Sequence, residues 1–368
     1  MKEELENGRK KSLTDKKVSG RRWKIFLTIF CAGVIALIGG AGILFKEELK
    51  ITGSIRPVIE EKNIYYMEVE GDYHFEEFLA LGGASSDREV SAFLTNCISK
   101  GFYQVEVTNE GPACSTISAL DSEGSHVFGR NFDWGNSVPI IVRCMPEDGY
   151  ASISTCDFQN ITESPDVLPK DFMVKMLAIA SVYVPMDGIN EAGLCVADLE
   201  VNEGGMIETD TEKPDLTITT AIRLLLNKAA TVEEAVELLG QYDIHASGGI
   251  SHHLAICDAT GASVSVEFVK GEMIVVDTNY ITNFNLANGD ITAGGESAKE
   301  RYELLESIYK EKNGVLTDEE IKDALCRVSK KEGEWTTQWS IVYRQDTQTV
   351  GYYFDGEYQD GISFQVVD

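Results

Sequence analysis

The sequence lacks the motifs that usually hold a metal ion or a nucleotide. It contains five histidines and no HExxH or paired CxxC pattern. His252 and His253 are adjacent in an expected strand, so their side chains would project to opposite faces and would not chelate one ion together. No glycine-rich loop joins an expected strand to an expected helix, because the glycines of 39–42 lie inside a long apolar run. Metal catalysis and nucleotide binding are therefore disfavoured, and no cofactor is expected.

Positive charge is scarce outside the N-terminus. The net charge is −28, while residues 1–24 carry nine Lys/Arg against four Asp/Glu, so the remaining residues carry −33. Such an acidic body argues against nucleic-acid partners. Trp335 and Trp339 stand four residues apart near an expected strand start, where isolated indoles are more often core or rim than a base-stacking platform.

Charged residues are absent from one long stretch, Ile25 to Phe45, which as a helix is long enough to cross about 30 Å of hydrocarbon. The basic tail at 1–24 precedes it, so we expect a single-pass anchor at 25–45 with a cytoplasmic N-terminus and an extracellular body. A cleaved signal peptide is the alternative. The apolar core of a signal peptide would be shorter than this stretch, and no Ala-x-Ala-like cleavage site is evident near Phe45, so the anchor is favoured.

The eight cysteines show no dense disulfide framework. Several lie in apolar runs such as Leu194-Cys195-Val196, where cysteine acts as a small hydrophobe. Apart from Cys31 in the apolar span and Cys114, we expect mostly free, buried thiols.

Residues Cys114 to Asp133 have the pattern of a β-hairpin, with two alternating runs around Asp121-Ser122-Glu123-Gly124-Ser125. A loop centred on Glu123-Gly124 would place Asp133 opposite Cys114, and would place Arg130 on the other face. A bulge at Gly129 could bring the arginine back to the thiol. The alternative is a buried structural cysteine beside a surface aspartate.

This stretch, a cysteine followed fifteen residues later by Gly-Arg-Asn-Phe-Asp, resembles the linear amide C–N hydrolases of the N-terminal-nucleophile superfamily. That family includes choloylglycine hydrolases, penicillin V acylases and the N-acylethanolamine amidase and acid ceramidase group. The resemblance implies that Cys114 becomes the first residue of a mature domain at 114–368, with Arg130 and Asp133 in its active site. It also implies that residues 46–113 are a propeptide, although alone they read as a strand-poor connection followed by a small helical cap or linker.

Further segments are similar to other signatures of the family. Residues 187–193 are expected to form a turn-rich loop that enters a strand at 194–201. The phrase DGINEAGLCVADLE, which spans both, ends on Glu200, where bile salt hydrolases have Asn and N-acylethanolamine amidases have Glu; a carboxylate at an exposed strand end is the alternative. Asn283 matches the family asparagine that supplies a neutral oxyanion donor, with Asn279 as the second candidate. Arg301 resembles a family arginine near the site, or is a solvated helix arginine.

The order of the expected elements is hairpins, helices, hairpins, helices and strands, which indicates an α+β fold with antiparallel sheets covered by helices. The resemblance implies a four-layer αββα sandwich. Helices are expected at 172–183, 217–228, 232–239, 300–311 and 319–328, two of them behind capping boxes at Thr231 and Thr317.

These features predict a membrane-anchored amidase that hydrolyses a linear amide bond of a small N-acyl substrate through a thioester on Cys114. The α-amine of an N-terminal cysteine, with a pKa of about 8, would serve as general base. An acyltransferase that uses the same thioester, or a non-catalytic binding relative, is the alternative. Neither the substrate nor the oligomeric state follows from the sequence.

Overall fold

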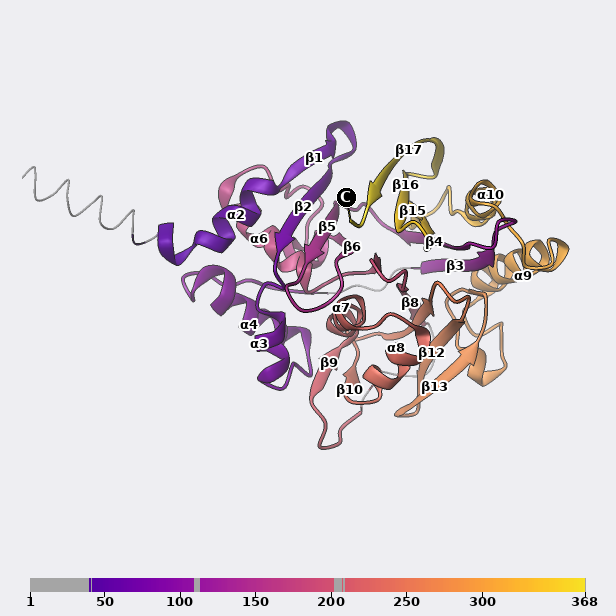
Figure 1. The fold of residues 1–368 in the computed structure, drawn as a ribbon, viewed down its shortest axis with the longest axis horizontal. Coiled ribbons are helices and arrows are strands. Elements are labelled where there is room, and N and C mark those ends of the chain that lie inside the picture. The colour runs from indigo at the N-terminus through magenta and orange to yellow at the C-terminus, as the bar shows by residue number, and fades with distance from the viewer. Residues whose placement is uncertain (1–39, 41, 109–112, 202–206, 208, 368) are drawn as a thin grey trace, which may run out of the picture. The chain divides into compact units, whose positions relative to one another are not determined.

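The computed structural model describes residues 40, 42–108, 113–201, 207 and 209–367 (Figure 1). The chain separates into two compact units, Met1–Lys50 and Ile51–Asp368, and helix α2 (Lys46–Ser54) crosses their boundary. The predicted tail at 1–24 lies outside the described residues, and so does the predicted span at 25–45 except for residues 40 and 42–45. No helix within the described residues is long and apolar enough to cross a membrane.

Two β-sheets form the centre of unit Ile51–Asp368. The first has nine strands in the order β1 (Arg56–Ile59), β2 (Ile64–Glu70), β5 (Pro139–Met145), β6 (Ser152–Asp157), β7 (Asp187–Asn190), β8 (Cys195–Val201), β11 (Ser251–Cys257), β12 (Ser263–Val269) and β13 (Glu272–Asp277). The second has six strands in the order β14 (Tyr280–Ile281), β3 (Ala113–Leu120), β4 (His126–Trp134), β15 (Thr336–Arg344), β16 (Thr349–Phe354) and β17 (Glu357–Gln365). A separate parallel pair joins β9 (Asp215–Thr217) to β10 (Asp243–His245).

Helices cover the outer face of each sheet. Helices α9 (Glu296–Glu311) and α10 (Asp318–Val328) pack on the six-stranded sheet, and α7 (Ile218–Lys228) and α8 (Val232–Leu239) pack on the nine-stranded sheet. The expected helix at 172–183 is divided into α6 (Phe172–Ala178) and the 3₁₀ helix η2 (Ile179–Val182). The other helices in the described residues are α3 (Phe75–Ala80), α4 (Asp87–Ser99), α5 (Gln159–Thr162), η1 (Glu60–Lys62) and η3 (Leu286–Asn288).

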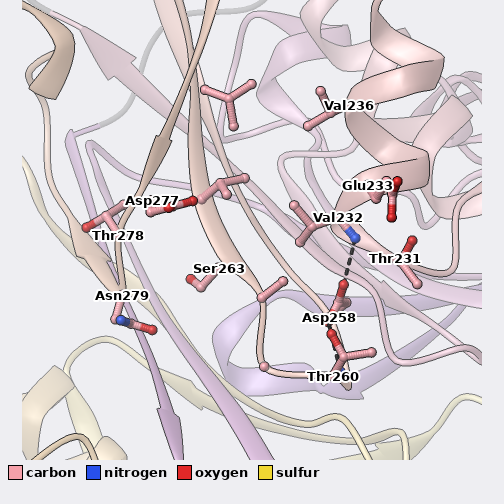
Figure 2. A pocket seen from close by; sticks show the side chains of 14 residues that line it. Thr231, Val232, Glu233, Val236, Asp258, Thr260, Ser263, Asp277, Thr278 and Asn279 are labelled. Carbon is pink, nitrogen blue, oxygen red and sulfur yellow. Dashed lines mark hydrogen bonds between the residues drawn. The ribbon is translucent and has the colours of Figure 1, made fainter.

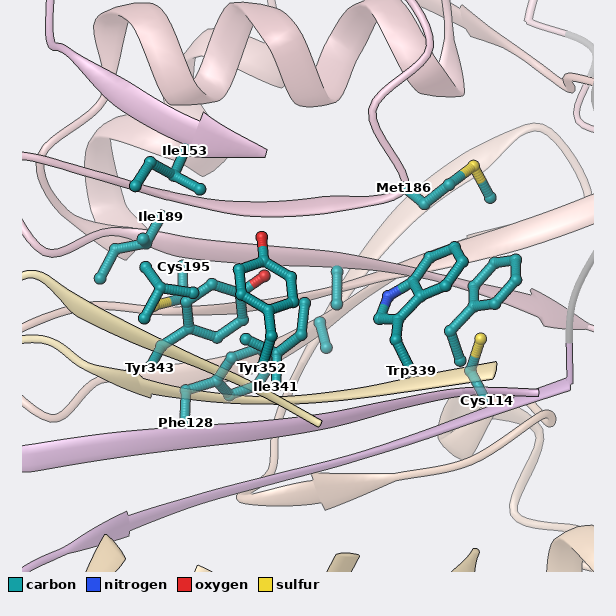
Figure 3. Packing of buried hydrophobic residues seen from close by; sticks show 14 of the residues in the cluster. Cys114, Phe128, Ile153, Met186, Ile189, Cys195, Trp339, Ile341, Tyr343 and Tyr352 are labelled. Atoms are coloured by element: carbon teal, nitrogen blue, oxygen red, sulfur yellow. The ribbon is translucent and has the colours of Figure 1, made fainter. Parts of the chain in front are cut away.

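The main core lies between the two sheets (Figure 3). Buried side chains of the nine-stranded sheet, such as Ile153 and Cys195, meet Phe128, Ile341 and Tyr343 of the six-stranded sheet. A second core under α9 and α10 contains Leu305 and Ile321. The predicted α+β class is confirmed, and the layers follow the order helix, sheet, sheet, helix.

The hairpin of β3 and β4 forms as predicted, but its register differs by one residue. Cys114 pairs with Phe132, and Asp133 pairs with Ala113. The cause is the turn: the Asp121 N–H donates to the Ser125 carbonyl at 2.7 Å, which leaves a three-residue loop that ends on Gly124 at φ +91°. Loops of this length use a left-handed residue at their last position, for which glycine is suited.

The predicted bulge at Gly129 does not occur. Gly129 pairs in register with Ile117 on one side and with Val342 on the other. A Cβ at this position would lie 2.6 Å from Ile321 Cγ2 of helix α10. Glycine is therefore required by the close approach of α10 to the sheet, and the only irregularity of the β4–β15 pair lies between Thr337 and Trp339.

Residues 51–108 are not strand-poor, contrary to the prediction. Strand β2 pairs in parallel with β5, with Tyr65 opposite Ile140 and Val69 opposite Cys144. The side chains of Tyr65, Tyr66 and Met67 are each at most 3% exposed, as expected for a strand covered on both faces. This segment is thus an integral part of the nine-stranded sheet.

The chain approaches Ala113 along one face of helix α4. Hydroxyl groups of Ser91, Thr95 and Ser99, spaced one turn apart, accept hydrogen bonds from the backbone N–H groups of Val107, Val105 and Tyr103 at 2.8, 2.9 and 3.2 Å. We call these three residues the hydroxyl row. Side-chain hydrogen bonds from this row hold the extended segment 103–107 on helix α4, whereas a β-sheet would hold such a segment by backbone hydrogen bonds.

Candidate active site

Cys114 lies on β3 and faces the core between the sheets. Its side chain is fully buried beside the stacked pair of Phe132 and Trp339, whose ring centroids are 3.7 Å apart (Figure 3). Burial raises the pKa of the Cys114 thiol to about 12, although Arg130 acts in the opposite direction. The thiol is therefore protonated at neutral pH in this structure.

Asn283 and Arg301 bind the two peptide groups of Cys114. The Cys114 N–H donates to Asn283 Oδ1 at 3.0 Å, and Arg301 Nη1 donates to the Cys114 carbonyl at 2.5 Å. Arg301 Nη2 also donates to Asn283 Oδ1 at 2.8 Å. Asn283 follows β14, which pairs with β3, and Arg301 projects from α9. Two elements distant in sequence thus fix the backbone at the expected nucleophile.

Asp133 lies opposite Ala113, the residue that precedes the nucleophile. Because it pairs with Ala113, it lies on the face of the hairpin opposite the Cys114 side chain, so the predicted thiol–carboxylate neighbours are not found. Its Oδ1 accepts a hydrogen bond from Thr337 Oγ1 at 2.6 Å, and its Oδ2 lies 3.5 Å from Arg301 Nη1. No hydrogen-bond donor within the described residues reaches this buried Oδ2. Burial raises the pKa of Asp133, while Arg301 lowers it.

Arg130 pairs with Thr116 and therefore shares the face of Cys114 without any bulge. Its guanidinium is fully buried, with Nε 3.0 Å from Asp187 Oδ2 and Nη2 donating to the Asp198 carbonyl at 3.0 Å. Its charge is the strongest one that favours the Cys114 thiolate. Regular strand alternation is therefore enough to place Arg130 on the face of Cys114, and the predicted bulge is not needed.

Asp187 is a site residue that the sequence interpretation missed. We expected a turn-rich loop at 187–193, but Asp187–Asn190 is strand β7. The buried Asp187 carboxylate accepts hydrogen bonds from Trp339 Nε1 and Tyr343 Oη, each at 3.0 Å, in addition to its ion pair with Arg130. The sequence signal that could have identified Asp187 is its position as the first residue of the DGINEAG phrase that leads to Glu200.

Glu200 contacts the site through its main chain. Its carbonyl accepts a hydrogen bond from Asn283 Nδ2 at 2.9 Å. Glu200 pairs with His252, which binds Asp198 Oδ1 through Nδ1 at 2.9 Å. Burial raises the pKa of the Glu200 carboxyl, although His252 lowers it.

Asn279 is not brought to Cys114. Its carbonyl binds the Ser118 N–H at 2.7 Å, four residues along β3 from the nucleophile. Its side chain lines a separate cavity of about 760 Å³ beside α8, together with Asp258 and Asp277 (Figure 2). Asn283 is therefore the better placed of the two asparagines.

The described residues hold no cluster of three or more His, Cys, Asp or Glu side chains that could bind a metal ion. Seven cysteines in the described part of the chain are free, and six of these are buried. The expectation of free, buried thiols is confirmed for these residues. The site is thus an arrangement of a cysteine, two arginines, an asparagine and carboxylates.

Comparison with known proteins supports the family resemblance. Residues 114–286 match the model of the linear amide C–N hydrolases, choloylglycine hydrolase family. This match confirms the predicted resemblance to that family and the predicted enzyme class, a hydrolase of linear amide bonds. No curated protein matches the chain.

Solved structures share the fold. A mutant of the conjugated bile acid hydrolase from Clostridium perfringens is 18% identical with a TM-score of 0.52, and the match covers 68% of this chain and 92% of that one. Penicillin V acylase from Agrobacterium tumefaciens is 20% identical with a TM-score of 0.49, over 68% and 86% of the two chains. The likeness to the bile acid hydrolase places the two-sheet core in the fold that the resemblance implied.

The ion pair of Arg130 and Asp187 should set the reactivity of Cys114. Replacing both residues by apolar ones, as Arg130→Met with Asp187→Leu, is expected to raise the pKa of the thiol, because the strongest charge favouring the thiolate is lost. Both are replaced because a single removal leaves an unpaired buried charge, which costs about 3–5 kcal/mol. The rate of alkylation of Cys114 by iodoacetamide, followed against pH, measures the shift.

Arg223→Met is the matched control for this experiment. Arg223 is also fully buried, but it binds Ser152 and Ser154 of β6 through its guanidinium at 3.0 and 2.7 Å, and is not among the main charges acting on Cys114. Its replacement should leave the alkylation profile in place. A profile of the double variant that stays unchanged or moves to lower pH would show that Arg130 does not activate the thiol.

Proposed function

We propose that this protein is an amidase whose nucleophile, Cys114, becomes N-terminal when the Ala113–Cys114 bond is cleaved by the chain itself. One observation supports the proposal: Asp133 is paired with Ala113, and its buried Oδ2 has no hydrogen-bond donor among the described residues, although Arg301 Nη1 lies 3.5 Å away. A buried carboxylate oxygen that lacks a donor is costly. The α-ammonium group created by cleavage would supply a donor that the described residues do not provide.

The cleavage step uses the groups that surround this peptide bond. Cys114 Sγ attacks the Ala113 carbonyl carbon, the bond to the Cys114 nitrogen breaks, and the thiol proton passes to that nitrogen. Asp133, whose pKa burial raises, lies across from Ala113 on the side of the hairpin away from the thiol, where it would hold the new amine. Water then hydrolyses the thioester, which leaves a carboxylate on Ala113 and a free thiol on Cys114.

Turnover repeats this chemistry on an N-acyl substrate. The α-amine of Cys114 takes the thiol proton, the thiolate attacks the amide carbonyl, and the α-ammonium returns the proton to the departing amine. Water then attacks the thioester and releases the acid. Asp133 would hold the α-amine, Arg130 would favour the thiolate, and Asn283 Nδ2 would turn from the Glu200 carbonyl to the oxyanion.

Intact mass of the purified protein tests the proposal. Protein expressed from about residue 46 should separate, under denaturing conditions, into a leader that ends at Ala113 and a chain that begins at Cys114. Cleavage should accompany the appearance of amide hydrolysis. An uncut polypeptide that hydrolyses amides after prolonged incubation would contradict the proposed role of an N-terminal cysteine.

We further propose that residues 25–45 anchor the protein in the cell membrane and that the catalytic domain lies outside. The support is the 21-residue uncharged stretch behind a basic tail. Protease added to intact cells should digest the catalytic domain and spare residues 1–24. A mature protein that has lost its apolar segment would instead indicate a cleaved signal peptide.

A further inference from the structure

The end of strand β8 supplies two main-chain acceptors to the candidate site. The Asp198 carbonyl accepts a hydrogen bond from Arg130 Nη2 at 3.0 Å. The Glu200 carbonyl accepts one from Asn283 Nδ2 at 2.9 Å. Both acceptors lie beyond the last residue of β8 that pairs with β7. The backbone at this end of β8 therefore places the two side chains that we expect to act on the thiolate and on the oxyanion.

A buried histidine ties this end of β8 to strand β11 and to the loop before it. His252 and Asp198 are both fully buried. The Nδ1 atom of His252 lies 2.9 Å from Asp198 Oδ1, and its Nε2 lies 3.0 Å from the Ser247 carbonyl oxygen. Among the described residues, His252 is the one hydrogen-bond donor to the Asp198 carboxylate, whose Oδ2 has none. This bond adds a side-chain tie to the main-chain pairing of β8 with β11.

With Asp198 ionised, this geometry requires His252 to be an imidazolium. A carboxylate and a carbonyl oxygen only accept hydrogen bonds, so both ring nitrogens carry hydrogen. Burial alone would lower the pKa of His252, but the charge of Asp198 and the two hydrogen bonds raise it above its ordinary value of 6.5. Electrostatic interaction also links His252 to Glu200 on β8, to Asp87 on α4 and to His253 on β11.

Loss of a proton from this pair would change the charge at the site. The pair is intact below the raised pKa of His252 and breaks as the pH rises through that pKa. Asp198 then remains as a buried carboxylate without its imidazolium partner. Burial is the main cause of the raised pKa of the Cys114 thiol, and the charge of Asp198 raises it further. A neutral His252 therefore disfavours the thiolate.

We propose that His252 is a positioning residue, which holds the end of β8 through Asp198. Arg130 and Asn283 then act on Cys114 only while this bond is formed. The inference rests on the proposed amidase function for its kinetic consequence alone, because the reactivity of the Cys114 thiol can be measured without any substrate.

Asp198→Asn tests the charge of the pair while keeping its shape. Asparagine Nδ2 would donate to Nδ1 of a neutral His252, and His252 Nε2 would still donate to the Ser247 carbonyl. In wild type, kcat for hydrolysis of the chromogenic amide decanoyl p-nitroanilide should fall as the pH rises through the pKa of His252. The variant should keep kcat within about 3-fold of wild type at about pH 7, and should lose this alkaline fall.

His252→Ala tests the bond itself. It leaves the Asp198 carboxylate buried and unpaired, so Arg130 and Asn283 lose their fixed positions. We expect kcat to fall about 10-fold or more, with a smaller change in KM. Alkylation of Cys114 by iodoacetamide at neutral pH should slow by about 10-fold, which corresponds to a rise of about one unit in the pKa of the thiol. Asp198→Asn should be alkylated at nearly the wild-type rate.

His245→Ala is the matched control. His245 Nε2 also binds a carboxylate, Asp215 Oδ1 at 2.7 Å, but this bond joins the separate strand pair β9 and β10. The kinetics, their pH dependence and the alkylation rate of this variant should stay as in wild type.

The inference would be overturned by a wild type without the alkaline fall, by an equal fall in Asp198→Asn, or by a folded His252→Ala that keeps the wild-type kcat and alkylation rate. If His252→Ala does not fold, Asp198→Asn decides. A wild type that fails to hydrolyse the amide would instead contradict the proposed function, and the alkylation rates would still test the role of His252.

Discussion

Replacing Cys114 by alanine is expected to abolish both chain cleavage and amide hydrolysis. Alanine has no attacking atom for either reaction, and no other thiol or histidine is bonded to the Ala113–Cys114 peptide groups in the described part of the chain. Hydrolysis should fall to the rate of the assay blank, while the free energy of unfolding changes only by the few kcal/mol of a buried side-chain truncation. N-terminal sequencing together with an amide-hydrolysis assay measures both outcomes.

Cys114→Ser separates the two reactions. Cleavage is intramolecular, so its high effective molarity compensates in part for a weaker nucleophile. Hydrolysis of a substrate gains less from effective molarity, and a serine hydroxyl is also far less ionised than a thiol. The serine variant should therefore cleave slowly and hydrolyse poorly. Cys156→Ala, at another fully buried cysteine, is the matched control and should retain both reactions. Normal hydrolysis by Cys114→Ala would eliminate the nucleophile assignment.

Asn283→Ala is expected to lower kcat by roughly 100-fold or more, with a much smaller change in KM. The substitution removes the acceptor of the Cys114 N–H and of Arg301 Nη2, and also the Nδ2 donor. Asn279→Ala is the matched control, because Asn279 lies at the separate cavity. Steady-state kinetics of processed enzymes measures the difference, and a larger loss in Asn279→Ala would reassign the donor.

Asn283→Asp distinguishes positioning from oxyanion stabilisation. Aspartate keeps an oxygen for the Cys114 N–H and for Arg301, but it replaces the Nδ2 donor by a second acceptor. If Asn283 stabilises the oxyanion, this variant should cleave its own chain faster than Asn283→Ala yet lose turnover to a similar extent. Turnover close to wild type in Asn283→Asp would show that the amide only positions the nucleophile.

Most residues of the candidate site were predictable from short patterns, but their geometry was not. Cys114, Asp133, Asn283 and Arg301 were all named from the sequence, and the structure brings them together within hydrogen-bond distance or one ion pair. The register error came from the turn, because a five-residue polar stretch fits both a two-residue and a three-residue loop. One residue of slip exchanges the faces of a strand, which is why Arg130 was placed on the wrong side.

Contacts between distant segments account for the other errors. Gly129 was interpreted as a bulge because the approach of Ile321 on α10, almost two hundred residues later, leaves no local trace. Strand β2 was missed because its partner β5 begins about seventy residues further on, and a run covered on both faces has no alternation. Asp187 was assigned to a loop because its partners Arg130, Trp339 and Tyr343 come from two other strands.

Cleavage of Ala113–Cys114 would change the order of the refolding reaction. The strand β2 and the hydroxyl row on α4 precede the cut, whereas β5, with which β2 pairs in parallel, follows it. The uncut chain refolds in a unimolecular reaction. A cut enzyme consists of two polypeptides that share one sheet, so its reassembly is bimolecular and its melting temperature depends on protein concentration. Dilution after melting would leave the two parts apart, and the lifetime of the active enzyme would then be governed by its rate of unfolding. Because the nine-stranded sheet takes strands from both sides of the cut, each cut molecule would fold only once.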